Sequence, residues 1–184
     1  MIDMAALQTR IVTGLRAHLQ PLGVTAIIER DQNAPVPPYP FVGFKWIAIT
    51  PEPGSLRRTR AVVPAQDPKW EHDVQYTYIR NPIMTLSMTV FDRDGTRIHG
   101  ITQATHDWFS IPEMGGDWLQ PTGAVIVEVT PITDRDTVLD EQIERRQGFD
   151  VRLRVVDILQ VTVPTIERVL VTGMGGEIAQ EIQL

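Results

Sequence analysis

Residues 144–155 read ERRQGFDVRLRV, and the rest of the chain is organised around this stretch. From Phe149 onward, apolar and charged residues alternate. The apolar residues are Phe149, Val151, Leu153 and Val155, and the charged ones are Asp150, Arg152 and Arg154. A period of two is typical of a strand that buries one face. We expect Gly148 to be a hinge between a charged connector and this strand, whose outer face resembles no catalytic apparatus.

Length and composition favour a single domain over residues 1–184. The chain is 42% hydrophobic, lacks cysteine and carries a net charge of -6. The lack of cysteine removes disulfides and thiol chemistry and fits a reducing cytosol, and the acidic balance argues against general nucleic-acid binding. No apolar run approaches the ~20 residues of a membrane helix. The start of the chain has the amphipathic pattern of a helix and not the pattern of a signal peptide.

The periodicity outside the opening stretch predicts two helices and several strands. Leu7, Ile11 and Leu15 recur at helical spacing within a helix over 3–20, and a second helix is expected at 97–109. The predicted strands cover 24–28, 41–50, 74–78, 84–90, 125–129 and 161–172. Because this order lacks regular βαβ units, we predict an α+β fold, a mostly antiparallel sheet with two helices packed on it.

The segments between these elements are predicted to be irregular. They are 35–40, a proline-rich stiff connector; 51–71, an extended loop or arm with a short strand at Val62 and Val63; 110–123, a loop; 134–147, a charged loop or helical turn; and 174–184, a flexible C-terminal tail. Proline, glycine or a high density of charge marks each of the internal segments.

Residues 90–96, VFDRDGT, resemble the first motif of the haloacid dehalogenase-like phosphatases. The resemblance would make Asp92 a nucleophile and Asp94 a general acid, with magnesium between carboxylates. The family's later lysine has no counterpart, because Lys45 and Lys69 both precede the motif. A strand-to-helix turn capped by Thr96 or Asp94 explains the same residues without catalysis.

Other candidate sites fail on spacing. His99 and His106 are separated by two helical turns, roughly 10 Å, which is too far for one metal ion. The Asp92–Gly95 sequence also resembles a calcium loop, but no suitably spaced glutamate completes it. We therefore predict no catalytic residue, no cofactor and no metal ligand, and we expect the protein not to be an enzyme.

Two stretches of the chain carry a family resemblance. Residues 33–35 (NAP) with 38–42 (PYPFV) form one, and residues 144–153 form the other. With the Trp108-Phe109 helix between them, they resemble the neck- or tail-terminator proteins of tailed bacteriophages. The resemblance extends over nearly the whole chain, as far as residues 165–167.

The resemblance implies a structural virion protein that forms a ring, commonly a hexamer, at the head-proximal end of the tail. Such a ring caps the tail tube and joins it to the neck or connector protein; the sheath protein is a further candidate partner. DNA would pass through the lumen without specific binding, no membrane is involved, and assembly would occur in the host cytoplasm. The alternatives are another phage structural protein (tail-completion, tube or baseplate) and, more distantly, a phosphatase that uses Asp92.

Contacts between ring subunits require complementary surfaces on one chain. The candidate subunit-interface residues are the charged side chains of the arm and of the opening stretch: Arg57, Arg58, Arg60, Arg145, Arg146, Asp150, Arg152 and Arg154. A solvated sheet face is the alternative explanation for the arginines of the opening stretch.

Overall fold

The computed structural model describes residues 1–31, 35–52, 54–139 and 142–164, and the chain divides into two compact units. The sheet-and-helix unit comprises residues 1–55 and 81–157. The three-stranded unit comprises residues 56–80 and the chain from 158 onward. Whether the whole chain folds as one domain stays a prediction.

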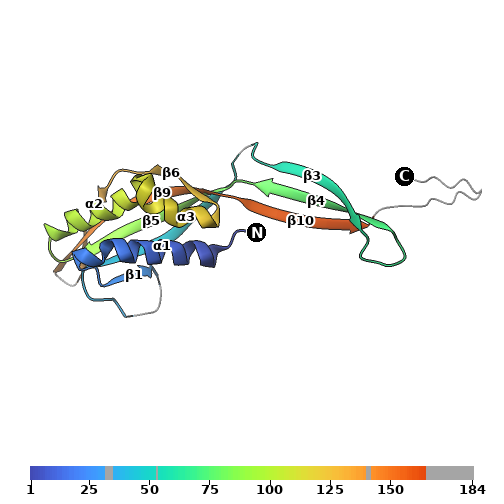
Figure 1. The fold of residues 1–184 in the computed structure, drawn as a ribbon. Coiled ribbons are helices and arrows are strands. Elements are labelled where there is room, and N and C mark those ends of the chain that lie inside the picture. Colours follow the sequence, from blue (N-terminus) through green and yellow to red (C-terminus); the bar gives the residue numbers. More distant parts are fainter. Residues whose placement is uncertain (32–34, 53, 140–141, 165–184) are drawn as a thin grey trace, which may run out of the picture. The chain divides into compact units, whose positions relative to one another are not determined.

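The sheet-and-helix unit is a sheet with helices on one face (Figure 1). Its strand order is β1-β2-β5-β9-β6, and the short β7 and β8 also pair with β9. The strands are β1 (Ala26–Glu29), β2 (Phe41–Thr50), β5 (Ile83–Asp92), β6 (Ala124–Val129), β7 (Thr133–Asp134), β8 (Thr137–Leu139) and β9 (Gln142–Val155). The helices are α1 (Met4–Leu19), α2 (Arg97–Ser110) and α3 (Asp117–Leu119), with short helical turns at Gln20–Leu22, Pro112–Gly116 and Gln120–Thr122.

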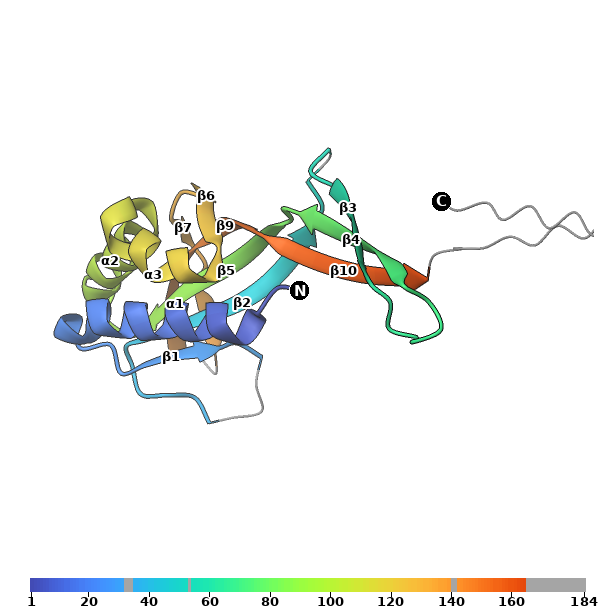
Figure 2. The same ribbon diagram turned by 45° about the vertical axis from the view of Figure 1, so that its right-hand side comes forward.

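The turned view shows the helices along one face of this sheet (Figure 2). The hydrophobic core lies between the helices and the sheet. Phe149 of β9 contacts Phe109 of α2 with ring centroids 6.1 Å apart, and Trp108 is 1% exposed. Gly14 lets α1 approach this cluster, because a Cβ there would lie 2.6 Å from Trp108 and 2.9 Å from Trp118. The glycine inside the first helix therefore serves close packing.

The described residues of the three-stranded unit form one sheet layer with the strand order β10-β4-β3. Its strands are β3 (Arg57–Pro64), β4 (His72–Arg80) and β10 (Asp157–Pro164), of which Asp157 belongs to the other unit. β3 and β4 are antiparallel, with Arg60 opposite Tyr76 and Val62 opposite Val74. Thus β3 occupies the middle of the segment that the sequence predicted as an extended loop or arm.

The predicted α+β class with a mostly antiparallel sheet is confirmed, but several local predictions are wrong. Residues 110–123 contain helical turns and α3, and residues 134–147 contain β7, β8 and the start of β9. Gly148 is no hinge, because β9 runs through it and pairs with β5 from Arg145 to Arg154. The strands β1 and β2 run parallel. The predicted strand end at 165–172 and the tail at 174–184 lie outside the described residues.

The segment predicted to be a charged connector is the start of strand β9, and its pairing with the buried strand β5 explains why it is extended. Arg145 and Arg146 pair with Asp92 and Phe91 of β5, so backbone hydrogen bonds extend β9 beyond its apolar part. Strand propensity depends on cross-strand neighbours more than on the residue itself. A polar segment can therefore be a strand when its partner is already in place.

Candidate functional site

The charged face of β9 lies on the side of the sheet opposite its apolar core residues, and its charges are paired within the subunit. Asp150 accepts from Arg135 at 3.2 Å. Arg152 donates to Glu128 at 2.8 Å, and Arg154 donates to Glu52 at 2.7 Å. These pairs are partly exposed, and pairs of this kind contribute about 0–1 kcal/mol each. The face is therefore an ordered array of both charge signs rather than a basic patch.

Arg135 is a site residue that the sequence analysis missed. It follows β7, and its guanidinium crosses above Gly148 to reach Ser87 at 2.9 Å and Asp150 at 3.2 Å. The space exists because residue 148 has no side chain. The sequence predicted a loop around residue 135, which did not place this arginine beside Gly148. The strand pairing of Thr133 with Gly148 brings it to that position.

The first half of β9 carries an arginine–aromatic cluster. Phe91 stacks on Phe41 with ring centroids 4.5 Å apart, and the guanidinium of Arg146 lies 5.2 Å from the Phe91 centroid. Arg146 also pairs with Glu144, which accepts a hydrogen bond from the Tyr39 hydroxyl. Burial, and then the bond to this carboxylate, raise the pKa of Tyr39 above its usual value. The cluster joins the proline-rich connector to β9.

Asp136 holds the backbone and side chains at the start of β9 together. Its carboxylate accepts from the Arg146 backbone N–H at 2.7 Å and from the Arg145 side chain at 2.7 Å. Burial opposes ionisation, but these hydrogen bonds, together with one to Asp134 and the charge of Arg145, hold the pKa of Asp136 below its usual value. Arg145 and Arg146 are therefore engaged within the subunit, as Asp150, Arg152 and Arg154 are.

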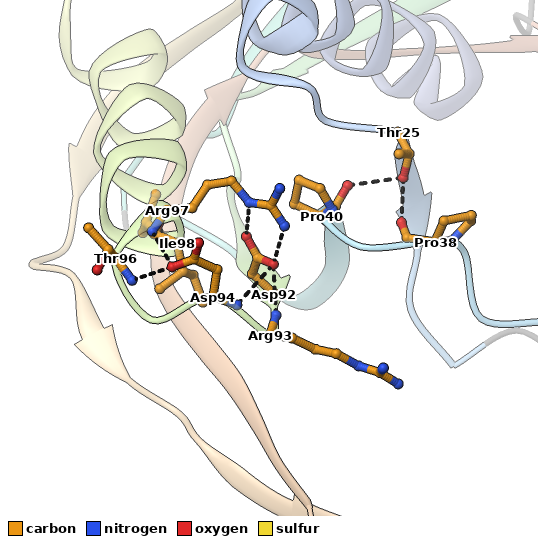
Figure 3. A network of polar contacts seen from close by, with 10 residues as sticks. Thr25, Pro38, Pro40, Asp92, Arg93, Asp94, Thr96, Arg97 and Ile98 are labelled. Carbon is orange, nitrogen blue, oxygen red and sulfur yellow. Dashed lines mark hydrogen bonds and ion pairs between the residues drawn. The ribbon is translucent and has the colours of Figure 1, made fainter.

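The phosphatase-like motif forms a structural turn between β5 and α2 (Figure 3). The Asp92 carboxylate is fully buried and accepts two hydrogen bonds from Arg97, each at 2.6 Å, and one from the Arg93 backbone at 2.7 Å. Asp94 accepts from the backbone N–H groups of Thr96 and Arg97, at 2.8 and 3.1 Å, and so caps α2. Both carboxylates that the motif would use in chemistry are occupied by this turn.

Electrostatics agree with a structural role for Asp92. Burial opposes its ionisation, but the Arg97 side chain and the backbone N–H groups of Asp94 and Arg93 outweigh burial and lower the pKa of Asp92. Among the residues that the structure describes, no group of three or more histidine, cysteine, aspartate or glutamate side chains is arranged to hold a metal ion.

We expect Asp92→Asn to lower the free energy of unfolding by about 2 kcal/mol at neutral pH, because charge-assisted hydrogen bonds to Arg97 are lost. The folded-state pKa of Asp92 lies below its ordinary value of 3.8. The stabilisation is therefore present above that value and is lost as the pH falls through the folded-state pKa. Urea unfolding of wild type and variant at pH 7 and pH 3 measures both effects.

The two proteins should converge in stability at low pH, and a difference that stays constant would contradict the linkage. Glu113→Gln is a suitable control, since Glu113 is an exposed carboxylate in the turn after α2. That variant should match wild type at both pH values.

The remaining candidate interface residues lie on β3, in the three-stranded unit. Arg58 lies over the Tyr76 ring, with its guanidinium 4.3 Å from the centroid. Arg57 and Arg60 are exposed and make no ion pair with any described residue. The predicted interface residues thus fall into two groups, one paired on β9 and one open on β3.

In this α+β fold, the phosphatase-like motif serves to join a strand to a helix. A family model described as phage neck terminator protein matches residues 9–178, and the chain belongs to this family. The predicted family is therefore confirmed, and with it a place in the tail and neck region of the virion among other neck and tail proteins. No curated protein matches the chain. Within the described residues, no helix has the length and apolar character needed to cross a membrane.

Proposed function

We propose that this protein terminates the phage tail as a homo-oligomeric ring, a hexamer, at the head-proximal end of the tail. The ring caps the tail tube and joins it to the neck or connector protein, and assembly takes place in the host cytoplasm. One observation supports the proposal in addition to family membership: the described part of the three-stranded unit is one sheet layer that leaves large apolar side chains exposed. They include Val62, Leu159, Val161 and Val163.

A sheet layer buries its apolar residues by packing against another layer. Exposed apolar groups of this kind mark protein–protein contacts. Contacts with further copies and with the tube protein would supply the missing layer. In a contractile tail, the sheath protein would be a further partner.

The charge of the chain suits a ring through which DNA passes. With a net charge of -6, the subunit lacks the excess of basic residues that drives release of counterions from DNA. Each arginine of β9 is paired with a carboxylate of the same subunit: Asp136, Glu144, Glu128 or Glu52. DNA would therefore slide past the subunits without being held.

We expect the purified protein to form rings and to fix the length of tail tubes when added to polymerising tube subunits. Negative-stain microscopy of the mixture shows both rings and tube ends, and light scattering measures the ring mass. A protein that stays monomeric with and without tubes, and leaves tube growth unchanged, would contradict the proposal. Antibody labelling of virions separates this role from tube or baseplate roles, since a terminator is labelled only beneath the head.

A further inference from the structure

Strand β6 leaves one edge of the large sheet open beside an apolar groove. Among the described residues, β6 pairs only with β9. A groove of about 660 Å³ runs between β6 and the residues around the end of α2 and α3. Val125 and Val127 on β6 are 62% and 43% exposed. An unpaired edge beside such a groove is a template for strand addition, in which backbone hydrogen bonds hold an incoming strand.

The groove is acidic as well as apolar. Its lining contains the carboxylates Asp117 and Glu128 and no basic residue. Glu128 is paired with Arg152, whereas Asp117 makes no ion pair with any described residue. An incoming strand that carries both basic and small apolar side chains would therefore fit.

Strand β3 has these properties. It is an outer strand of the three-stranded unit and pairs only with β4 in the part of the chain that the structure describes. Its sequence is RRTRAVVP, in which Arg57 and Arg60 are exposed and without a described ion-pair partner. It has 8 residues against 6 in β6, so it is long enough to pair with the whole of that strand. The other outer strand, β10 (DILQVTVP), has no basic residue.

We propose that β3 of one copy adds to the free edge of β6 in the next copy. This step rests on the proposed ring and names the surface that closes it. The two edges differ, so every copy offers one of each, and head-to-tail contacts of this kind form a ring when the rotation between successive copies closes. The basic end of β3 meets the acidic groove. Successive side chains of a strand point to opposite faces, so either Val62 or the pair Ala61 and Val63 faces the apolar part of the groove.

A feature of β6 makes the edge selective. The pairing with β9 shifts between Ile126 and Glu128, which leaves Val127 as the extra residue of a bulge. Bulges interrupt an edge and discourage pairing with arbitrary strands. A partner must therefore be complementary in side chains as well as in backbone, and the next copy meets that condition.

The absence of cysteine makes a direct test possible. Thr59→Cys and Ala61→Cys are placed on β3, and Val125→Cys and Val127→Cys on β6; all four positions are exposed. Each β3 variant is mixed with each β6 variant, the proteins are assembled together and oxidised mildly, and products are separated without reductant. At least one mixture should convert roughly half of its monomer to a disulfide-linked dimer, which is the limit for random mixing of two variants, because bridging requires Cα atoms within about 7 Å.

The matched control is Arg10→Cys on the exposed side of α1, which should stay monomeric with every partner. A variant with one cysteine on each strand should give a ladder that ends at the number of subunits in the ring. A cross-link formed within one chain, or formed by Val161→Cys of β10 in place of β3, would overturn the assignment. Rings that form without any β3–β6 cross-link would also overturn it while leaving the proposed function intact; absence of rings and of tube capping would refute both.

Discussion

Replacing Gly148 by valine is expected to lower the free energy of unfolding by about 3 kcal/mol, because the site has no room for a side chain. A Cβ there would lie closer than 3.0 Å to the backbone carbonyl oxygen of Met88 and 2.8 Å from Nη1 of Arg135. The carbonyl belongs to the neighbouring strand β5, so relief requires a shift of the backbone in the middle of the sheet. Urea denaturation followed by circular dichroism measures the change.

Gly100→Ala is the control for this substitution. Gly100 lies in α2, and a Cβ there meets no atom within 4 Å. Alanine is the better helix former, so this variant should be more stable than wild type by roughly 0.5–1 kcal/mol. Equal effects of the two substitutions would show that the crowding above Gly148 does not determine its role.

Reversing the three arginines of β3 together (Arg57→Glu, Arg58→Glu and Arg60→Glu) is expected to abolish ring assembly while the monomer stays folded. Repulsion from the acidic groove would weaken each subunit contact by about 3 kcal/mol, roughly a hundredfold in affinity. All three side chains are exposed, so no core packing is lost. Analytical ultracentrifugation reports assembly, and circular dichroism reports folding.

A control variant carries the same change in net charge at three basic residues outside β3. Arg10, Arg16 and Lys69 are exposed, and their joint replacement by glutamate should leave ring formation intact. If both triple variants fail to assemble, general repulsion explains the result. If the β3 variant assembles normally, those arginines do not contribute to a subunit contact.

The alternation from Phe149 to Val155 was sufficient to predict the buried strand and which of its faces is apolar. The turn at Asp92 was also predictable, because aspartate and glycine suit turns whatever the surrounding fold. The sequence did not predict that β9 begins at residue 142 or that the Arg135 side chain passes over Gly148. Both depend on partners distant in sequence, which local propensity does not register.

The same long-range contacts explain why the two recognised stretches belong together. The Tyr39 hydroxyl donates to Glu144 across 105 residues of sequence. Arg146 lies over Phe91, which in turn stacks on Phe41. The proline-rich connector and the start of β9 therefore form one packed cluster, although neither stretch predicts the other by periodicity.

The position of β9 in the sequence has a consequence for how the protein is made. It is the strand between β5 and β6, yet it comes from residues 142–155, and β10 of the three-stranded unit follows immediately at 157–164. Neither sheet can be completed until most of the chain has left the ribosome, and such non-local pairings form slowly. Folding is thus completed only after β9 and β10 have been made, so freshly made subunits pass through a stage in which β5 and β4 each lack one of their two partner strands.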